Sequence, residues 1–219
     1  SFDLVKKVRN TIKSNLNIRK IKVGHAGTLD PLADGLLIIC TGKFTKKIDE
    51  IQRQKKVYTG EITLGGTTPS YDLETEIEET FDTSHITEEL IHNSCKKFEG
   101  KIMQKPPIYS ALKREGKRLY QHAREGTKIE IKEREVEIEY FKITSIEMPK
   151  LKFEVVCSKG TYIRSLAYDF GKELNSGALL SALRREKIGD YYLSDAFSLN
   201  SFMEDIVKND MEFGNYRDG

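Results

Sequence analysis

The chain has 219 residues, of which 38% are hydrophobic and 32% charged, with a net charge of +2 at pH 7. This composition is typical of a soluble globular protein and excludes a disordered one. No apolar run approaches the roughly 20 residues that cross a bilayer. The length allows one domain, or one domain with a small appendage.

The cysteines carry no sign of a metal site or a disulfide framework. Cys40, Cys95 and Cys157 lie far apart and form no C-x-x-C pair, which zinc ligation would require. His85, His92 and His122 also lack the spacing of metal ligands. We therefore expect reduced, buried cysteines, a cytoplasmic protein and no metal.

Charge is segregated along the sequence. Three segments are basic and one is acidic: 1–22, 43–56 and 101–128 against 72–90. Segregated basic segments are typical of a polyanion binder. The alternative, solvated faces of ordinary surface helices, is equally compatible with charge alone.

The first half of the chain alternates helical and extended patterns. Apolar residues at helical spacing predict an amphipathic helix over 3–16. Alternation predicts a strand over 56–64, with Tyr58 on its apolar face. Between them we expect a short strand at 21–23 and a glycine-rich loop at 24–35. An apolar strand at 36–40 and a basic helix at 43–54 follow the loop.

The second half begins with Thr87 as the expected N-cap of a helix that ends at Gly100. We then expect a basic helical segment at 116–125 and a hairpin of strands 135–147 and 151–158. A helix at 162–174, a strand at 179–188 and a final helix at 201–207 follow. Strands and helices do not alternate in a βαβ rhythm. A mixed or antiparallel α+β sheet is therefore favoured over a Rossmann fold.

The most unusual stretch is Gly24–Gly35. Its glycines and the Leu29-Asp30-Pro31 turn restrict the backbone, so Asp30 is held for nucleophilic or acid–base work. The alternative is a turn-forming aspartate that caps nearby backbone amides, and these residues alone favour it. A phosphate loop is disfavoured, since neither glycine-rich phosphate-binding pattern is present.

Two further stretches carry candidate residues. Cys157–Leu166 joins a strand to a helix and places Arg164 near the helix start, where it would bind a carboxylate or phosphate, or simply lie on the surface. Tyr58 is either a core aromatic or a ring on which a nucleobase stacks.

Together these stretches resemble the TruB family of tRNA pseudouridine-55 synthases. The catalytic motif of that family is similar to Gly-His-Ala-Gly-Thr-Leu-Asp-Pro-Leu-Ala-Asp-Gly at 24–35. Its tyrosine and arginine motifs resemble Lys55-Lys56-Val57-Tyr58 and Lys159-Gly160-Thr161-Tyr162-Ile163-Arg164. Lys105–Lys113 resembles the start of the RNA-gripping thumb loop, and Leu183-Arg184-Arg185 a late segment. The resemblance covers roughly residues 1–200.

The resemblance implies a site and a reaction. The catalytic residues would be Asp30, Tyr58 and Arg164, with Arg164 paired to Asp30 and Tyr58 stacked on the uracil. Substrate-binding roles are implied for His25, Asp72, Tyr162, Leu183 and Lys113, with His25 filling the space of the flipped base and Asp72 orienting Tyr58 or the backbone. The reaction oxidises nothing and donates no group, so we expect no cofactor and no metal.

The resemblance also implies an architecture: a bent, mixed and mostly antiparallel sheet with flanking helices and a central cleft. A catalytic domain over 1–200, with a thumb loop at about 106–134, would precede a short helix and tail over 201–219 without a separate RNA-binding module. Family members usually carry a strand before the position of Ser1, and we expect that piece to be missing. The expected partner is the T-stem loop of tRNA, bound by a monomer without guide RNA.

Three other functions are compatible with parts of the sequence. A non-catalytic RNA-binding or tRNA-folding protein would keep the basic segments, but it has no need of Asp30, Tyr58 and Arg164 together. A guide-RNA-dependent relative normally keeps the additional RNA-binding module. A phosphohydrolase that used Asp30 would need a metal and a second carboxylate at position 32, which is Leu32.

Overall fold

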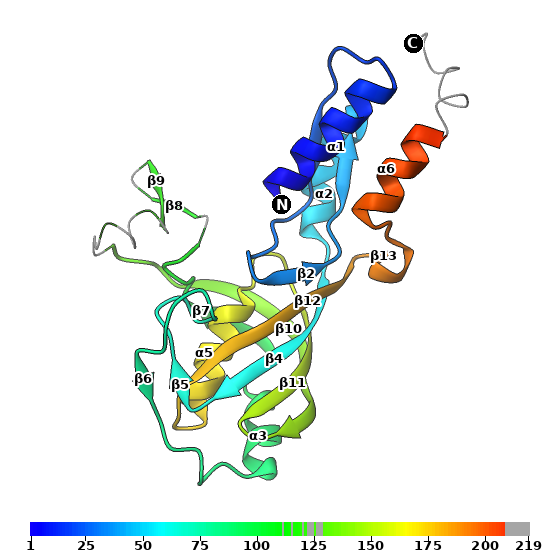
Figure 1. Ribbon diagram of the computed structural model, residues 1–219. Coiled ribbons are helices and arrows are strands. Elements are labelled where there is room, and N and C mark those ends of the chain that lie inside the picture. Colours follow the sequence, from blue (N-terminus) through cyan, green and yellow to red (C-terminus); the bar gives the residue numbers. More distant parts are fainter. Residues whose placement is uncertain (111, 115, 120, 122–124, 126–128, 209–219) are drawn as a thin grey trace. The chain divides into compact units, whose positions relative to one another are not determined.

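The computed structural model describes residues 1–208 except 111, 115, 120, 122–124 and 126–128 (Figure 1). At positions 113, 114, 118, 207 and 208 it describes the backbone alone. The chain forms two compact units. The first unit comprises 1–31, 35–54 and 186–219, and the second comprises 32–34 and 55–185. No helix in the described part of the chain is both long and apolar enough to span a membrane.

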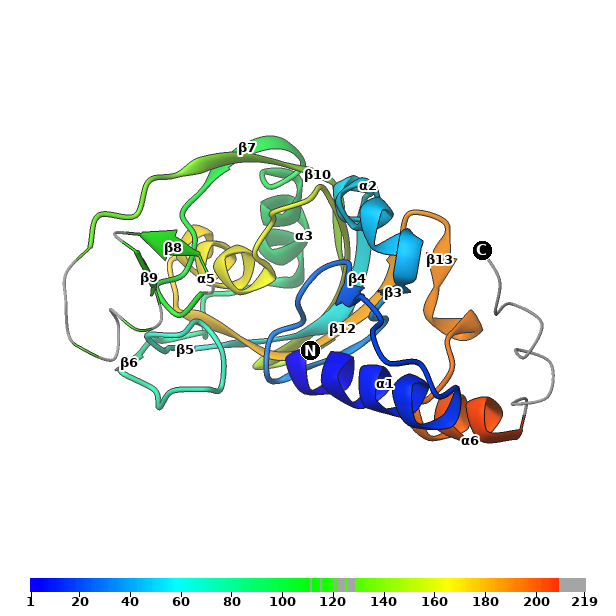
Figure 2. The ribbon, with the colours of Figure 1, turned by 90° about the horizontal axis from the view of Figure 1, so that it is seen from above.

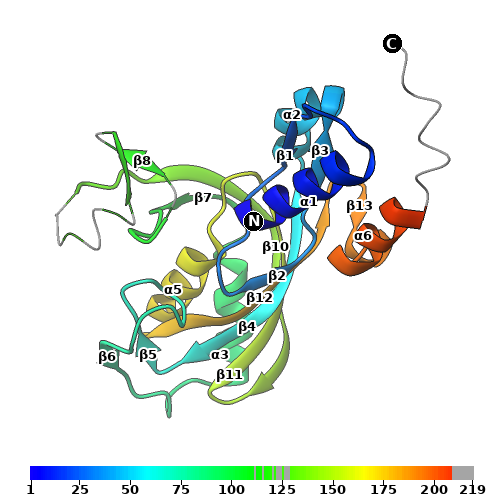
Figure 3. The ribbon, with the colours of Figure 1, turned by 45° about the horizontal axis from the view of Figure 1, so that its top comes forward.

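The first unit is built on two helices that pack side by side, α1 (Phe2–Asn15) and α6 (Leu199–Lys208), as Figure 3 shows. The apolar face that the sequence predicts for α1 buries Val5, Val8 and Ile12, and Ile206 of α6 joins the same cluster. Burial of one apolar stripe, rather than helix propensity, stabilises a helix of this length. The helix expected at 201–207 is confirmed.

A second small core holds the strands of the first unit. It consists of five buried side chains: Ala26, Leu36, Cys40, Ile51 and Ile188. The elements around it are β1 (Val23–His25), β3 (Ile39–Thr41), η1 (Gly42–Lys47), α2 (Ile48–Arg53), β13 (Tyr191–Tyr192) and η2 (Leu193–Asp195). β1 and β3 pair antiparallel, which aligns His25 with Ile39.

The second unit contains a sheet with the strand order β12-β4-β11-β10-β7. Its strands are β4 (Lys56–Leu64), β7 (Gly100–Gln104), β10 (Arg134–Glu147), β11 (Lys150–Cys157) and β12 (Ala178–Ile188), whose last three residues belong to the first unit. The pairs β4–β11, β11–β10 and β10–β7 are antiparallel. Short strands accompany this sheet: β2 (Ala33–Gly35) beside β12, β5 (Gly66–Thr67) with β6 (Glu79–Thr80), and β8 (Lys113–Arg114) with β9 (Lys117–Arg118).

Two helices cover one face of this sheet, α3 (Glu88–Lys96) and α5 (Ile163–Glu173), as Figure 2 shows. Between helices and sheet lies the main core, in which Phe141 contacts Phe153 and Phe170 edge to face. Such aromatic pairs stabilise a core beyond the area that they bury. The rings fix α5, and with it the candidate residues at the start of that helix.

The α+β class and the mostly antiparallel sheet are confirmed, as are the hairpin, the helix near 162–174 and the strand near 179–188. Thr87 caps α3 as predicted, because its side chain accepts a hydrogen bond from the Leu90 amide at 3.2 Å. The helix ends at Lys96 rather than Gly100, since Gly100 has a φ of +86° and starts β7.

Three other expectations were wrong in detail. The apolar run 36–40 is not one strand, because Gly35 (φ +102°) ends β2 and only the last two residues enter β3. The basic helix at 43–54 divides into the 3-10 turn η1 and the helix α2. At 116–125 the described residues include strand β9 before a helical hydrogen bond from the Glu125 amide to the Gln121 carbonyl. Positions 120 and 122–124 of that segment lie outside the described residues.

Candidate active site

The glycine-rich loop that follows β1 carries Asp30, in the first unit. The Ala26 amide donates to the Ile38 carbonyl at 2.9 Å, and the Leu29 amide donates to Oγ of Ser1 at 3.1 Å. Gly27 has a φ of +111°, a backbone conformation that side chains with a Cβ rarely adopt. These contacts anchor both ends of a short loop, so the half-buried Asp30 occupies a defined position, as the sequence predicts.

Strand β4 carries Tyr58, in the second unit. Tyr58 is aligned with Val155 of β11. Its half-buried ring packs against the main core, and so does the side chain of Leu183 on β12. Both side chains therefore lie against the packed main core of the second unit. Two residues earlier in β4, burial, together with the charges of Arg185 and Lys159, lowers the pKa of Lys56 to about 8.

The start of α5 is held by a glutamine that sequence reasoning missed. Gln104 is fully buried and forms two hydrogen bonds with Tyr162: its Oε1 accepts from the backbone amide at 2.7 Å, and its Nε2 donates to the carbonyl at 3.0 Å. The guanidinium of Arg134 lies 4.6 Å from the centre of the Tyr162 ring. One face of the Tyr162 ring is thus covered by the guanidinium of Arg134. The substrate-binding role expected for Tyr162 stays a prediction.

Arg164 is the most enclosed of the expected site residues. Its side chain is 3% exposed, and its Nη1 donates to the carbonyls of Tyr109 at 2.9 Å and Ser70 at 3.3 Å. Its Nε lies 3.6 Å from Oδ2 of Asp72, whose side chain is 5% exposed. The surface alternative for Arg164 is therefore wrong. A buried arginine held by a carboxylate and two carbonyls has a fixed orientation.

Asp72 belongs to a loop that is ordered by its own side chains. Its Oδ1 accepts from the Glu74 amide at 2.9 Å, and its carbonyl accepts from Oγ1 of Thr68 at 2.7 Å. Ser70 bonds Oγ1 of Thr75 through both its backbone amide, at 3.1 Å, and its hydroxyl, at 2.8 Å. The resemblance suggested that Asp72 orients Tyr58 or the backbone. The structure shows its carboxylate bonded to the backbone amide of Glu74 in the same loop and ion-paired with Arg164.

An aromatic stack fastens the same loop to α5. Tyr71 has a φ of +64°, and its ring stacks on Tyr168 with centroids 4.0 Å apart and an interplanar angle of 16°. Its carbonyl accepts from the Leu180 amide at 2.9 Å. Burial, with the nearby Tyr168 and Asp169, raises the pKa of Tyr71 to about 12. Because Tyr168 lies one helical turn after Arg164, the stack and the Asp72–Arg164 pair attach neighbouring residues of one loop to one helix face.

The structure places the remaining expected residues less completely. His25 is half-buried on β1, in the same unit as Asp30. Lys113 lies in β8, but its side chain is outside the described residues. The pairing of Asp30 with Arg164 joins residues of different units and stays a prediction. In the described part of the chain, no cluster of three or more His, Cys, Asp or Glu side chains is suited to a metal ion.

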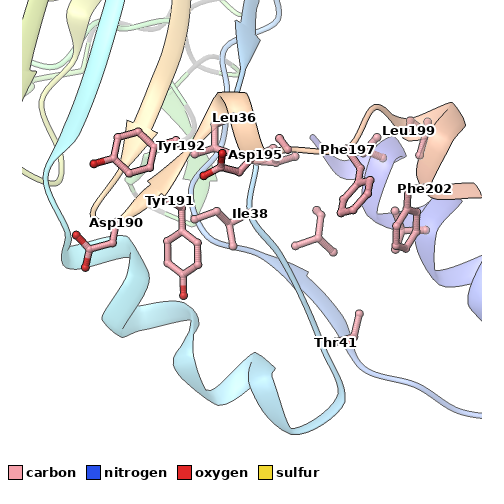
Figure 4. Close-up of a pocket in the computed structure, with 15 residues that line it drawn as sticks. Leu36, Ile38, Thr41, Asp190, Tyr191, Tyr192, Asp195, Phe197, Leu199 and Phe202 are labelled. Carbon is pink, nitrogen blue, oxygen red and sulfur yellow. The ribbon is translucent and has the colours of Figure 1, made fainter. Parts of the chain in front are cut away.

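An apolar pocket of about 470 Å³ lies within the first unit (Figure 4). Its walls come from α1, the segment around Leu36 and Ile38, β13, and the chain that leads from Phe197 into α6. None of the expected site residues lines it. Its position therefore gives no support to a uridine pocket there.

Comparison with known proteins connects this geometry to a family. Residues 13–163 match the model of the TruB family pseudouridylate synthase (N-terminal domain). The chain is 58% identical over 207 residues to "tRNA pseudouridine synthase B" of Flavobacterium johnsoniae, covering 94% of this chain and 90% of the relative. It is 51% identical over 209 residues to the protein of that name from Chloroherpeton thalassium, covering 95% and 86%.

Solved structures resemble the chain at lower identity. A chain of an H/ACA RNP bound to a substrate RNA containing 2′-deoxyuridine superposes with a TM-score of 0.63 at 26% identity, over 91% of this chain. A chain of a Cbf5-Nop10-Gar1 complex gives 0.61 at 31% identity, over 84%. This chain spans about half the length of those two, at 48% and 45%. By its family match and its identity to these relatives, the chain belongs to the TruB family of pseudouridylate synthases.

Proposed function

We propose that this chain isomerises a uridine of tRNA to pseudouridine, with Asp30 as the essential carboxylate. The observation that carries the proposal is the identity of 46–58%, over nearly the whole chain, to relatives named tRNA pseudouridine synthase B. The enclosed Arg164, the half-buried Tyr58 and the anchored loop of Asp30 agree with it, because a purely RNA-binding protein needs none of these arrangements.

The reaction defines what the residues must do. The N1–C1′ bond breaks, the uracil turns while bound, C5 joins C1′, C5 loses its proton and N1 gains one. Asp30 either attacks C1′ or removes a sugar proton, and both routes need one carboxylate in a fixed position. Tyr58 provides a ring over a rigid core on which the uracil stacks during its rotation. Arg164 supplies a cation whose direction is set by Asp72 and two carbonyls.

The substrate is uridine 55 in the T-stem loop, in line with the resemblance of the motifs. A base inside a folded loop cannot reach a protein carboxylate, so the enzyme must flip it out at a cost of a few kcal/mol. His25 fills the vacated space from the same unit as Asp30. The chain acts without guide RNA, because its identity to a relative named for tRNA is 58%, against 26% and 31% for the chains from H/ACA assemblies. A monomer and a cytoplasmic location are part of the same proposal, in line with the expectation from the sequence.

The experiment uses the purified chain and an unmodified tRNA transcript labelled with tritium at C5 of uridine. Single-turnover tritium release measures the chemistry, and reverse transcription after carbodiimide treatment maps the modified position. Asp30→Asn should abolish release while tRNA binding stays within about threefold. The matched control is Asp34→Asn, four residues along, which should keep nearly full activity because Asp34 is exposed. Release by Asp30→Asn within tenfold of the unsubstituted chain would refute the role of Asp30.

A further inference from the structure

Two adjacent hollows are lined by residues of α1 and of the segment that leads from α1 to β1. The larger, of about 420 Å³, is lined by five cationic side chains: Arg9, Lys13, Arg19, Lys20 and Lys22. The smaller, of about 360 Å³, shares Lys13 and Arg19 and adds the polar side chains of Asn10, Ser14 and Asn17. We call the two together the α1 basic site. Both hollows lie entirely within the first unit.

Within the described residues, the cations of this site have no neutralising partner. None of the five forms an ion pair with a carboxylate that the structure describes. Exposed lysines of the second unit behave differently. Six of them pair with glutamates: Lys55, Lys97, Lys101, Lys117, Lys150 and Lys152. Five like charges gathered in one concave surface repel one another, and an anionic ligand would remove that repulsion.

The site is also held in place. Val5, Val8 and Ile12 bury the opposite face of α1. On the site's own side, the half-buried Arg9 donates from Nη2 to the Val23 carbonyl at 3.2 Å, which ties the helix to the first residue of β1. The Leu16 amide closes the helix on Ile12 at 3.0 Å. A ligand would therefore meet cations on a supported surface rather than on a loose tail.

The lining selects the chemistry of the ligand. Guanidinium, ammonium, amide and hydroxyl groups are all donors to phosphate oxygens. Neither hollow has an aromatic lining residue on which a base would stack. Lys22 immediately precedes β1, and His25 ends it three residues later, or about 10 Å at the rise of a strand. The loop of Asp30 contacts the other end of α1, where the Leu29 amide donates to Oγ of Ser1. Lys13 lies twelve residues further along, roughly 18 Å at the rise of an α-helix.

We propose that the α1 basic site binds backbone phosphates of the tRNA, at a distance along the RNA from the uridine that the Asp30 loop handles. The inference rests on the proposed function for the identity of the RNA. It places an RNA contact in the first unit, separate from the segment 106–134 to which the sequence assigned the thumb. The contact positions the RNA by its backbone and does not read sequence.

The test compares two double variants with the same change of charge. Lys13→Ala with Arg19→Ala removes the two cations that both hollows share. Lys6→Ala with Lys7→Ala removes two exposed cations of the same helix that line neither hollow. Filter binding of the unmodified tRNA transcript is measured from 50 to 400 mM KCl. Thermal unfolding confirms that each variant keeps its fold.

The site variant should bind tRNA at least about tenfold more weakly at low salt. Its log–log salt slope should be shallower by about 1.4–1.8, because each lost phosphate contact removes about 0.7–0.9. The control should bind within about twofold. Equal losses in the two variants would overturn the proposal, since they would report only the general field of the helix. Unchanged slopes in both variants would overturn it as well.

The single-turnover rate of pseudouridine formation distinguishes this test from the test of the proposed function. At saturating tRNA, the single-turnover rate of the site variant should stay within about threefold of the unsubstituted chain. A large loss of rate with unchanged affinity would overturn the phosphate contact. If the unsubstituted chain binds tRNA but forms no pseudouridine, the proposed function fails while the binding comparison still decides the role of the α1 basic site.

Discussion

Two ion pairs in the second unit have nearly the same length and opposite surroundings. Arg164 and Asp72 lie 3.6 Å apart with side chains 3% and 5% exposed. Arg184 and Asp34 lie 3.7 Å apart with side chains 54% and 69% exposed. The change Asp72→Asn removes a buried carboxylate from beside the buried guanidinium of Arg164, whereas Asp34→Asn removes an exposed carboxylate from beside the exposed Arg184. Burial alone therefore predicts very different costs for the same chemical change.

The magnitudes follow from these surroundings. Removing one partner of a buried pair costs about 3–5 kcal/mol, because the other charge stays buried. An exposed pair contributes about 0–1 kcal/mol. For a chain of this size, 1 kcal/mol corresponds to roughly 2–4 °C in Tm. We expect Asp72→Asn to lower Tm by about 6–20 °C and Asp34→Asn by no more than about 4 °C.

Thermal and urea unfolding followed by circular dichroism at pH 7 measures both variants against the unsubstituted chain. A companion variant, Arg164→Lys, keeps the charge but loses the planar fork that reaches Ser70, Tyr109 and Asp72 together. It should lose about 10²-fold or more in single-turnover rate, or roughly 2.7 kcal/mol. Equal Tm values for Asp72→Asn and Asp34→Asn, or a normal rate for Arg164→Lys, would contradict this account of Arg164.

Two other predictions concern stability. Burial raises the pKa of Asp169 to about 6, with Glu133 raising it and Lys172 lowering it, so ionisation of the folded state costs stability as pH rises from about 4 to 6. Asp169→Asn should raise Tm at pH 7.5, and the gain should vanish near pH 4; a constant gain would contradict the shift. Gly60→Ala would place a Cβ 2.3 Å from the Ala182 carbonyl oxygen and should cost about 1–3 kcal/mol or more in urea unfolding. The control Gly66→Ala meets nothing closer than 3.5 Å and should cost much less.

The elements that sequence predicted well are those whose signal is local. The alternation in 56–64 became β4, because one face of that strand packs on the core and period-2 burial is visible in the residues themselves. Thr87 became an N-cap for the same reason, since a cap bonds an amide three residues away. Helix and strand ends were less predictable where a glycine with positive φ, such as Gly35 or Gly100, decides them.

The contacts that sequence could not supply are those between distant segments. Gln104 is an ordinary residue in the sequence, and only the fold brings its amide to the backbone of Tyr162. Asp72 was expected at the site, but its pairing with Arg164 depends on how the loop lies against α5. The stack of Tyr71 on Tyr168 had no sequence signal, because a tyrosine beside an aspartate is as common in an ordinary turn.

The distribution of charge explains how a chain with a net charge of only +2 can bind a polyanion. Residues 1–22 hold seven Lys or Arg and one acid, and the cations of the α1 basic site pair with no carboxylate that the structure describes. In the second unit, glutamates form ion pairs with several of the lysines. The net charge adds the cations of the α1 basic site to the ion-paired lysines of the second unit, so it does not show that the former are concentrated in one place. Phosphate contacts depend on local cations over about a Debye length, roughly 10 Å at 0.1 M salt, so a basic hollow binds RNA whatever the rest of the surface carries.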